Sequence, residues 1–358
     1  MPTGGGAQLM QRGPSTRAAH AGVPAPVQGA PIMPGPVLAA PFHLAGEIGD
    51  IPAYNRDGNP TWELYERALA EFEGADVAIF ASGMAAVHAA LETTLKPGDV
   101  LVAPNDGYPG TRKIADQHLR PRGIEVRLVP TDEAAVRDAL GGATVVWLES
   151  PSNPGLDVVD IGAIAAATDA LVVVDNTLAG PLHQPVRELG ADVTVMSATK
   201  YLTGHSDINM GYVAARETAQ LREWRRLTGA IPGPFETWLA HRSLATYPLR
   251  LERQLANARS LAEMLRERSE VSDVRYPGLG GVVCFTLADA DAAQRFLAAC
   301  ELVIEATSFG GLHSSAERRA RWGTDAIAEG FIRFSCGIED TADLLADVGR
   351  GLDVLRSA

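Results

Sequence analysis

Short apolar runs alternate with longer amphipathic stretches over most of the chain. Six apolar runs of strand length, rich in β-branched residues, lie at residues 76–82, 99–104, 125–130, 144–150, 170–176 and 192–200. Helix-like stretches separate most of these runs, for example at 83–95 and 161–170. Continuous apolar strands with helical crossovers are typical of a mostly parallel sheet that is buried on both faces. The pattern therefore predicts a large α/β domain, which we place at residues 59–239.

The pattern changes near residue 240. Helices are predicted at 249–268, 291–300 and 340–355, and strands at 281–288 and 330–337. This arrangement favours a smaller α+β domain at the C-terminal end, which we place at residues 240–358.

The first 58 residues are predicted to form an extended arm. Residues 1–41 contain eight prolines and seven glycines, which leave few interior positions for a helix or a strand. Such an arm is disordered or lies across a neighbouring subunit, and both alternatives stay open for its first twenty residues. A helix is predicted to follow at 61–75, because Gly74 stands in the position of a C-cap.

Composition and charge narrow the function classes. The chain has 358 residues, of which 46% are hydrophobic and 21% charged, and its formal net charge is −13. An acidic globular chain lacks the positive field that holds nucleic acid or anionic lipid. No apolar run approaches the ~20 residues of a membrane span, and the N-terminal residues lack the apolar stretch of an export signal. We therefore expect a cytoplasmic protein without nucleic-acid or membrane partners.

The three cysteines, Cys284, Cys300 and Cys336, are far apart in the sequence and lie in apolar surroundings. They are expected to be buried thiols in a reducing compartment. Because none has a second cysteine or a histidine at ligand spacing, no metal site is predicted.

Polar residues gather at the ends of the apolar runs, where α/β proteins place their ligand sites. Asp175 ends the run at 170–176 and Lys200 the run at 192–200, so their side chains can meet across one cleft. Taken alone, this pair is more simply explained as a buried structural salt bridge. Glu149 and Asn153 follow another of these runs.

The neighbours of this pair point to a cofactor. Gly83 and Met84 open a predicted helix, whose free N–H groups can bind an anion. The hydroxyls of Ser197 and Thr199 come just before Lys200. A lysine amine, a phosphate clamp and a carboxylate for the pyridine nitrogen are the anchors that pyridoxal 5′-phosphate requires. We therefore predict that the chain binds this cofactor.

Seven segments resemble one family of pyridoxal phosphate enzymes. They are YNRDGNPT from Tyr54, FASGMAA from Phe80, DGYPGT from Asp106, LESPSNP from Leu148, VVDNT from Val173, SATKYLTGHSD from Ser197 and IRFSCGIED from Ile332. In order and spacing they are similar to the cysteine and methionine metabolism family, which includes cystathionine γ-lyase, cystathionine γ-synthase, cystathionine β-lyase and methionine γ-lyase. The resemblance implies the fold of the fold type I pyridoxal phosphate enzymes. It also implies a homotetramer built from two dimers with shared active sites.

The resemblance implies a role in cofactor binding for each matching residue. Lys200 would hold the cofactor through a Schiff base, and Asp175 would pair with the pyridine nitrogen. Asn153 would bind the phenolic oxygen, and Tyr108 would stack on the ring. The phosphate would be held by Gly83, Met84, Ser197 and Thr199 of one subunit together with Tyr54 and Arg56 of its neighbour.

The substrate site follows from the same resemblance. Arg333 would bind the α-carboxylate of an amino acid through its planar fork, with Ser308 and Asn153 close by. Thr307 stands where members that act on cystathionine often have an acidic residue, and we expect it to face the distal part of the substrate. Lys200 and Tyr108 are the expected catalytic residues.

The chain departs from the family pattern in five places. Asn55 and Pro109 replace the small residues usual in their motifs. The longer basic connection that normally precedes the GGVVCF segment is nearly absent. From Leu312 the chain has LHSSAERRARWG instead of the usual proline and THA stretch, and Thr307 is not acidic. These departures concern the choice of substrate.

The resemblance implies a reaction on a small sulfur amino acid. Our first expectation is cystathionine γ-lyase, which converts L-cystathionine to L-cysteine, 2-oxobutanoate and ammonia. The main alternative is γ-replacement by cystathionine γ-synthase or O-acylhomoserine sulfhydrylase, which adds a thiol to the same intermediate. Methionine γ-lyase and cystathionine β-lyase rank behind these two. A cofactor-binding protein without turnover is the last alternative, and the complete set of Lys200, Asp175, Tyr108 and Arg333 argues against it.

Overall fold

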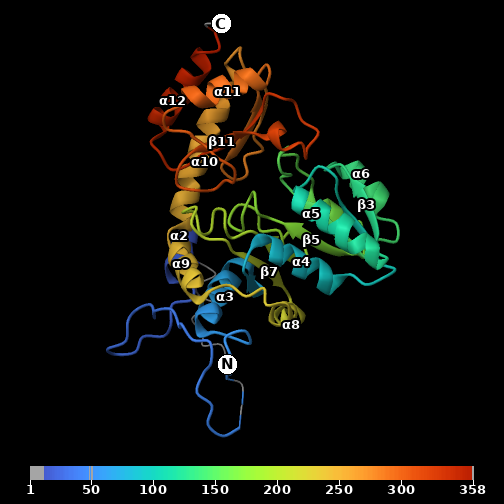
Figure 1. Cartoon of the computed structure of the whole chain (residues 1–358), viewed down its shortest axis with the longest axis vertical. Helices are drawn as coiled ribbons and strands as arrows, with labels where there is room; N and C mark the ends of the chain where they lie inside the picture. Colours follow the sequence, from blue (N-terminus) through green and yellow to red (C-terminus); the bar gives the residue numbers. More distant parts are fainter. Residues whose placement is uncertain (1–11, 48, 50, 357–358) are drawn as a thin grey trace.

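The computed structural model describes residues 12–47, 49 and 51–356, and contains two sheets (Figure 1). The larger sheet has the strand order β1-β7-β6-β5-β4-β2-β3. Its strands are β1 (Asp76–Phe80), β2 (Val100–Pro104), β3 (Glu125–Val129), β4 (Val145–Glu149), β5 (Leu171–Asp175), β6 (Val193–Met196) and β7 (Gly211–Ala215). Strands β3, β2, β4, β5 and β6 are parallel, whereas β7 is antiparallel to both β6 and β1. The expected α/β fold with a mostly parallel sheet is confirmed.

Six of these seven strands are predicted by the sequence, and β7 is not. Its residues, Gly-Tyr-Val-Ala-Ala, include a single β-branched side chain and form no distinct apolar run. Gly211 begins the strand where it passes close to the start of helix α4 (Gly83–Thr94): a Cβ at this position would lie 2.4 Å from the carbonyl oxygen of Ser82. Strand β7, which the sequence does not predict, therefore packs beside the start of α4, and the proposed site depends on that helix start.

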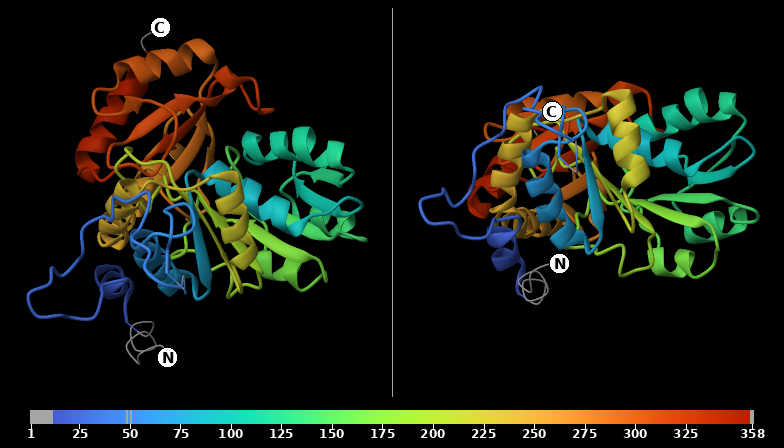
Figure 2. Two further views of the ribbon diagram at one scale, coloured as in Figure 1. Left: turned by 60° about the horizontal axis from the view of Figure 1, so that its bottom comes forward. Right: turned by 90° about the horizontal axis from the view of Figure 1, so that it is seen from below.

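Helices cover both faces of the larger sheet (Figure 2). One face packs against α4, α5 (Pro109–Ile114) and α8 (Ala219–Thr228), together with the helical turn at Ala115–Leu119; a further turn at Arg120–Arg122 has no buried residue. The other packs against α3 (Pro60–Glu73) and α9 (Pro234–Leu244) near β1 and β7, and against α6 (Glu133–Ala139) and α7 (Ile161–Ala165) near β4 and β5. Alternate side chains of β1 supply the two faces: Val77 and Ile79 join the core with α3 and α9, and Ala78 and Phe80 join the core with α4 and α8, as the two-residue period of a strand requires.

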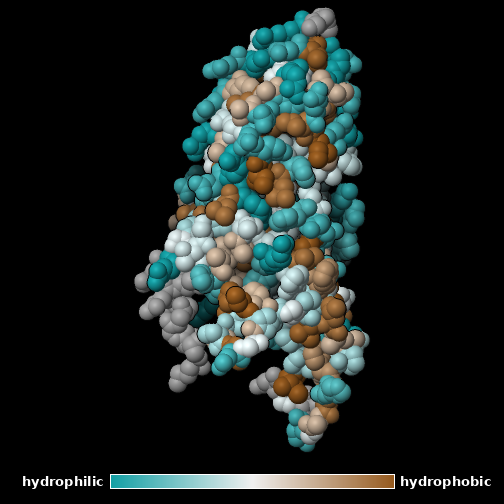
Figure 3. Space-filling view, turned by 90° about the vertical axis from the view of Figure 1, so that its left-hand side faces the viewer, coloured by the Kyte–Doolittle hydropathy of each residue, from teal (hydrophilic) through white to brown (hydrophobic). Residues whose placement is uncertain are grey.

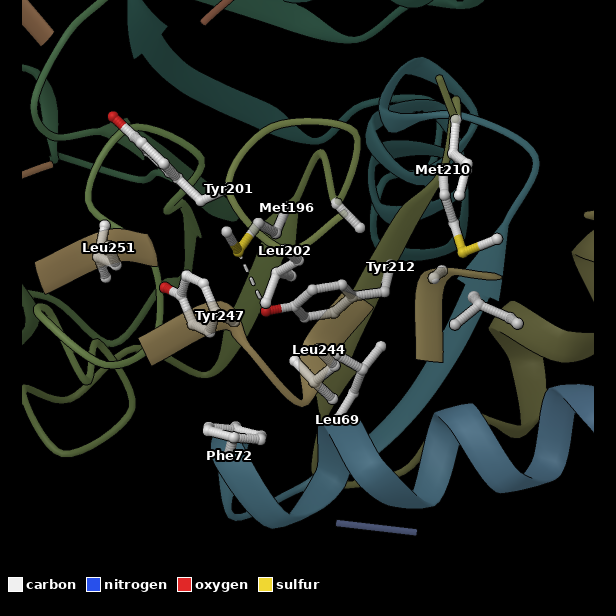
Figure 4. Close-up of a cluster of buried hydrophobic side chains, with 14 of the residues drawn as sticks. Leu69, Phe72, Met196, Tyr201, Leu202, Met210, Tyr212, Leu244, Tyr247 and Leu251 are labelled. Atoms are coloured by element: carbon white, nitrogen blue, oxygen red, sulfur yellow. Dashed lines mark hydrogen bonds between the residues drawn. The ribbon is translucent and has the colours of Figure 1, made fainter. Parts of the chain in front are cut away.

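The core between α3 and the sheet contains several aromatic side chains (Figure 4). The Tyr212 ring of β7 lies beside Leu69 of α3, and its hydroxyl points toward Met196, whose sulfur lies 3.1 Å away, and donates to the buried carboxyl group of Glu73. Burial raises the pKa of the Glu73 carboxyl group. These contacts join α3 to β6, which precedes the Lys200 loop, and to β7, which follows it.

The boundaries of α3 agree with their local sequence signals, whereas α7 ends earlier than the sequence predicts. In α3 the Asn59 side chain accepts from the amide of Thr61 at 2.8 Å, and Gly74 ends the helix with φ 64°. In α7 the helix ends at Ala165, five residues before the predicted end. The reason is a local turn, because the Thr168 hydroxyl accepts from the amide of Ala170 at 3.0 Å and competes with helix continuation.

The smaller sheet has the strand order β10-β11-β12-β9-β8. Its strands are β8 (Ser272–Arg275), β9 (Val282–Thr286), β10 (Ile304–Glu305), β11 (Ser315–Arg318) and β12 (Phe331–Ser335), with a helical turn at Arg319–Trp322 after β11. It packs against α10 (Tyr247–Arg266), α11 (Ala290–Ala299) and α12 (Thr341–Asp353). The sequence predicts β9 and β12, which are central and apolar, but not the short outer strands.

Helix α10 connects the two sheets (Figure 1). Its first half packs in the core of the larger sheet through Leu251, and its second half in the core of the smaller sheet through Leu261. The predicted domain boundary at residue 240 falls inside α9, where Ala240 and Leu244 pack against the larger sheet. The division at residues 59 and 240 stays a prediction.

The arm is mostly irregular but contains one helix that the sequence analysis does not expect. Helix α2 (Pro14–His20) begins with proline, which is tolerated at the first helical position. It packs on its own chain, where the Arg17 guanidinium lies 5.1 Å from the centre of the Phe72 ring. Residues 1–11 lie outside the described residues, so the two alternatives for them stay open.

Beyond α2, the arm presents apolar side chains to solvent. Ile32 is 83% exposed and Leu38 is 72% exposed. Figure 3 shows hydrophobic residues on the projection at the lower end of the molecule, where the arm lies. Contact of the arm with a neighbouring subunit stays a prediction.

Among the described residues, no helix combines the length and the apolar character that a membrane span requires. Those residues also contain no group of three or more histidine, cysteine, aspartate or glutamate side chains arranged to hold a metal ion. Cys284 and Cys336 are buried, whereas Cys300 is half-buried because it lies at the end of α11.

Candidate active site

A cavity of about 310 Å³ lies at the carboxyl ends of β4, β5 and β6 and reaches the smaller sheet. Eleven of the residues predicted from the sequence line it: Gly83, Met84, Tyr108, Asn153, Asp175, Ser197, Thr199, Lys200, Thr307, Ser308 and Arg333. The two that do not are Tyr54 and Arg56. Parallel strands bring their carboxyl ends to one edge of a sheet, which explains why residues so far apart in the sequence meet here.

Lys200 follows β6 on a tight turn, and its amine lies inside the cavity. Nζ donates to the Ser308 hydroxyl at 2.7 Å and lies 5.1 Å from the centre of the Phe309 ring. Burial, and then the positive charge of Arg333, lower the pKa of the Lys200 amine to about 8. A substantial fraction of this amine is therefore neutral near physiological pH, which makes it a nucleophile and a base.

Asp175 and Glu149 end the adjacent strands β5 and β4 and stand opposite each other in the sheet register. Burial raises the pKa of both carboxyl groups, and the negative charge of Asp175 raises that of Glu149 further. The amide of Thr177 donates to Asp175 at 3.0 Å, and no lysine or arginine of the described chain forms an ion pair with Asp175. A buried carboxylate without such a partner suits a cationic group of a ligand.

Glu149 positions two of the predicted site residues. Its carboxylate oxygens accept from the amide of Tyr108 and from the amide of Asn153, each at 2.7 Å. The sequence analysis notes Glu149 as a polar residue at a strand end but assigns it no role in the site. The signal that could have identified it is an acidic residue directly after a buried apolar run.

The start of helix α4 faces the turn before Lys200. The Ser82 hydroxyl accepts from the amide of Ala85 at 3.1 Å, and the first-turn amides of Gly83 and Met84 have no preceding helical turn to bond. A Cβ at Gly83 would lie 2.7 Å from the Ser197 Cβ, so only glycine permits this close approach. Helix α4 and the Ser197 loop thus form a cradle for an anion.

Thr199 is partly committed to the protein itself. Its hydroxyl donates to the Met210 carbonyl oxygen at 3.1 Å and accepts from the Met210 amide at 2.9 Å. It therefore fixes the Lys200 turn to the start of β7. Its expected contact with a phosphate stays a prediction.

Arg333 lies on β12, is buried, and has a partner for each terminal nitrogen. One nitrogen donates to the Asn153 side-chain oxygen at 2.7 Å; the other donates to the Ser308 carbonyl oxygen at 3.3 Å and forms an ion pair with Glu317. Ser308 has φ 80°, a conformation that few non-glycine residues adopt, and this turns its hydroxyl-bearing segment toward Lys200.

Glu317 and Arg319 are residues of this region that the sequence analysis misses. The carboxylate of Glu317 accepts from the Trp322 indole at 2.9 Å and from the Thr307 hydroxyl at 3.2 Å, and it pairs with Arg319 at 3.3 Å. Thr307 thus has a partner inside the protein, and its expected contact with the distal part of a substrate stays a prediction. No periodic pattern marks these residues, which lie in the segment that departs from the family sequence.

Tyr108 lies at the start of α5, and its side chain is 41% exposed at the cavity. Pro109 is the first residue of α5, a position that needs no free N–H, so this departure from the family pattern fits the helix. A Cβ at Gly110 would lie 2.6 Å from both the Tyr108 ring and the Met84 sulfur. The Tyr108 ring and the Met84 sulfur therefore both lie close to Gly110, where a side chain would collide with them.

Tyr54 and Arg56 lie on the arm, outside this cavity. Tyr54 is 44% exposed, and the Arg56 guanidinium lies 5.4 Å from the centre of its ring. Neither side chain reaches the cavity of its own chain. Their role in a neighbouring subunit stays a prediction.

The cavity offers a lysine amine of lowered pKa, an unpaired buried carboxylate and an anion cradle, which together fit pyridoxal 5′-phosphate. The fold and this site define a fold type I pyridoxal-phosphate-dependent enzyme. Residues 43–353 match the family model described as "Cys/Met metabolism PLP-dependent enzyme", and the chain belongs to that family.

Known relatives extend over nearly the full length of the chain. A Streptomyces coelicolor protein named "Putative cystathionine gamma-lyase" is 50% identical, and the match covers 98% of this chain and 96% of the relative. The cystathionine gamma-synthase of Mycobacterium tuberculosis is 39% identical over 95% of this chain and 97% of its own. The crystal structure of metB from Corynebacterium glutamicum has a TM-score of 0.93 at 34% identity, covering 97% and 99% of the two chains. The family resemblance and the cofactor inferred from the sequence are confirmed, and the chain is an enzyme of sulfur amino acid metabolism.

Proposed function

We propose that the protein cleaves L-cystathionine by γ-elimination, giving L-cysteine, 2-oxobutanoate and ammonia with the uptake of one water. The observation that carries this proposal is the Lys200 amine, whose pKa is lowered to about 8, in one cavity with Asp175 and Arg333. An amine of which a substantial fraction is neutral near physiological pH can both bind a carbonyl and remove a proton. The similarity to the Streptomyces coelicolor relative favours the lyase.

The residues of this chain would hold the cofactor in defined places. Lys200 would bind it covalently, Asp175 would pair with its pyridine nitrogen, and Asn153 with its phenolic oxygen. Gly83, Met84 and Ser197 would contact its phosphate. When bound, pyridoxal 5′-phosphate supplies an electron sink that lowers the energy of a carbanion at Cα.

The substrate would be oriented by Arg333. Its guanidinium is buried and already held by Asn153, so a carboxylate that binds to it loses little orientation freedom. Lys200, freed by the incoming amino group of the substrate, would remove the Cα proton. Tyr108 faces the same cavity and would protonate the sulfur that leaves from Cγ.

The second candidate function is γ-replacement on an O-acylhomoserine, as in a cystathionine γ-synthase. The Mycobacterium tuberculosis relative, at 39% identity, supports it. Both reactions use Lys200, Tyr108 and Arg333 in the same way up to the loss of the Cγ group. They differ in whether water or a thiol then enters.

We also propose that the active enzyme is a homo-oligomer, with a dimer as the catalytic unit and a tetramer of two dimers as the assembly. Tyr54 and Arg56 do not reach the cavity of their own chain, and they lie on an arm with exposed apolar side chains. In a dimer these two residues would complete the phosphate site of the neighbouring subunit.

Product analysis tests the proposed reaction. The purified enzyme is incubated with L-cystathionine, or with an O-acylhomoserine and L-cysteine, and the Lys200→Ala variant is the matched control. We expect 2-oxobutanoate, cysteine and ammonia in equal amounts from cystathionine alone. Pyruvate and homocysteine would instead identify a β-lyase, and cystathionine formed from the second mixture without breakdown of the first would identify a synthase.

A further inference from the structure

A chain of charged side chains leads from Arg333 to helix α5. Arg333 forms an ion pair with Glu317, which stands opposite it on the neighbouring strand β11. Glu317 pairs with Arg319 at 3.3 Å, and Arg319 pairs with Asp325 at 2.8 Å. Asp325 in turn pairs with Arg112 of α5 at 2.7 Å. This network of ion pairs joins β11 of the smaller sheet to α5 of the larger one, two elements that Figure 1 labels.

The two acidic residues of this ion-pair network are deeply buried. The side chains of Glu317 and Asp325 are each 3% exposed, and that of Arg319 is 9% exposed. A buried carboxylate that loses its partner is strongly destabilised, so each pair constrains its members to one geometry. Arg319 also lines the cavity, and its Nε atom is buried without a hydrogen-bond partner in the described chain.

The charges of these ion-paired side chains leave a place for an anion. Three guanidinium groups, those of Arg333, Arg319 and Arg112, face the two carboxylates of Glu317 and Asp325. One positive charge is therefore uncompensated. The carboxylate of an amino acid substrate would balance it at the Arg333 end.

At its other end the chain of ion pairs reaches Tyr108. Arg112 lies one helical turn after Tyr108, and its amide donates to the Tyr108 carbonyl oxygen at 3.4 Å. The Arg112 side chain also donates to the carbonyl oxygen of Thr324 at 3.1 Å and to that of Asn105 at 3.0 Å. Arg112 thus links the segment that contains Asp325 to the turn that carries Tyr108.

We propose that Asp325 is a positioning residue that sets the place of Tyr108 relative to Arg333. It does so by holding Arg112 on one side and Arg319 on the other. The inference rests on the proposed function, because it takes Arg333 as the carboxylate site and Tyr108 as the proton donor. Arg319 lies in the segment that departs from the family pattern, and Asp325 lies two residues after the end of that segment.

The kinetic test compares the effect of each variant on kcat with its effect on KM. Asp325→Asn keeps the shape of the side chain but removes its charge, and it should lower kcat/KM for L-cystathionine by about tenfold or more, since a small misplacement of reacting groups is costly. Arg112→Gln acts on the Tyr108 end and should lower kcat with KM within about twofold of wild type. Arg319→Gln acts on the Arg333 end and should raise KM with kcat within about twofold.

The matched control is Glu329→Gln in the same segment. Glu329 pairs with Arg318 at 2.8 Å but is 72% exposed, so this surface pair should contribute little, and the variant should retain wild-type kcat and KM. Asp325→Asn with wild-type kinetics would overturn the proposal. The proposal would also be overturned if Arg112→Gln and Arg319→Gln changed kcat and KM to the same extent. That result would show that the ion pairs only stabilise the fold.

A second readout is independent of activity. In the protein without cofactor, amide hydrogen exchange of a peptide that covers α5 should be faster in Asp325→Asn than in wild type, and unchanged in Glu329→Gln. Unchanged exchange in α5 would contradict the link between Asp325 and the Tyr108 helix. If the wild-type enzyme does not cleave cystathionine, the proposed function fails while this measurement still decides the link. If Asp325→Asn does not fold, Arg112→Gln and Arg319→Gln carry the test alone.

Discussion

At the scale of single residues, the site combines groups whose charges are adjusted by their surroundings. Lys200 has no carboxylate in direct contact among the described residues; Ser308 accepts a hydrogen bond from its amine, and burial favours the neutral form. Arg333, by contrast, keeps its charge close to Glu317 and Asn153. The pocket therefore holds one reactive amine and one fixed cation, and these two roles are not interchangeable.

The first prediction concerns the titration of Lys200. The chain has three lysines, and the other two, Lys96 and Lys113, are exposed. An amine reacts with acetic anhydride only when it is neutral, so a pKa lowered from 10.5 to about 8 places the rise in Lys200 labelling near pH 8. We expect competitive labelling of the protein without cofactor to show this midpoint. A midpoint above pH 10 would contradict the proposed environment of Lys200.

The second prediction concerns Arg333. Arg333→Lys keeps the charge but loses the planar fork, so kcat/KM for every amino acid substrate should fall together, on the order of tenfold to a hundredfold. Arg318→Lys on the neighbouring strand β11 is the control and should change kcat/KM little. A loss confined to one substrate would show that Arg333 contacts the side chain of the substrate and not its α-carboxylate.

At the scale of elements, the site depends on where helix α4 begins. Ser82 caps the helix, and a Cβ at Gly83 would collide with Ser197. Gly211 allows β7 to pass beside the same helix start. Glycine at positions 83 and 211 thus lets the start of α4, the Ser197 turn and β7 approach closely. This approach leaves the first amides of α4 open to an anion.

The third prediction follows from this close approach. Gly83→Ala introduces a Cβ 2.7 Å from the Ser197 Cβ, so the helix start and the Lys200 turn must move apart. We expect affinity for pyridoxal 5′-phosphate to fall by about tenfold or more, since overpacking of a close contact costs about 1–3 kcal/mol. Gly141→Ala, where nothing lies within 4 Å, should bind the cofactor as wild type does. Equal affinities of both variants, measured by absorbance titration, would place the phosphate elsewhere.

Sequence patterns predict the part of the site that lies at strand ends. Asp175 and Lys200 follow distinct apolar runs, and parallel strands bring their ends together, so the pair could be placed before the structure was known. The positions of Glu317, Arg319 and Asp325 could not be predicted in this way. They lie in a short outer strand, a helical turn and a loop, without hydrophobic periodicity, and their meeting depends on how the smaller sheet packs beside α5.

The same distinction holds for the elements. Central strands and long helices such as α10 are predicted because burial gives them continuous or periodic apolar positions. Strand β7 is missed because glycine and alanine make up most of it, and β11 because it contains charged residues. Helix α2 is missed because its seven residues form inside a proline-rich arm, where packing of Arg17 against Phe72 supports it.

At the scale of the whole molecule, two sheets share one cavity, and α10 connects their cores. Lys200 comes from the larger sheet and Arg333 from the smaller, so their relative position depends on how the two sheets pack. The arm adds a surface that its own chain does not cover, where Val27, Ile32 and Leu38 are each more than half exposed. Such apolar surface is suited to contact with a second copy.

The fourth prediction concerns this contact. If Arg56 acts in the neighbouring subunit, then coexpressing Arg56→Ala and Lys200→Ala chains should restore activity, because one site of each hybrid dimer has both residues intact. Random pairing would give about a quarter of the wild-type number of intact sites. Each variant expressed alone is the control and should be nearly inactive. No recovery in the mixture would show that Arg56 serves its own chain or has no role.

The central claim is that the cavity around Lys200 holds the cofactor, and one measurement tests it most directly. The enzyme as purified is reduced with borohydride, digested, and the peptides that contain its three lysines are compared by mass spectrometry. We predict that the reduced cofactor is found on the Lys200 peptide alone, and that the Lys200→Ala variant carries none. Reduced cofactor on Lys96 or Lys113, or none on any lysine of the wild-type enzyme, would contradict the proposed active site.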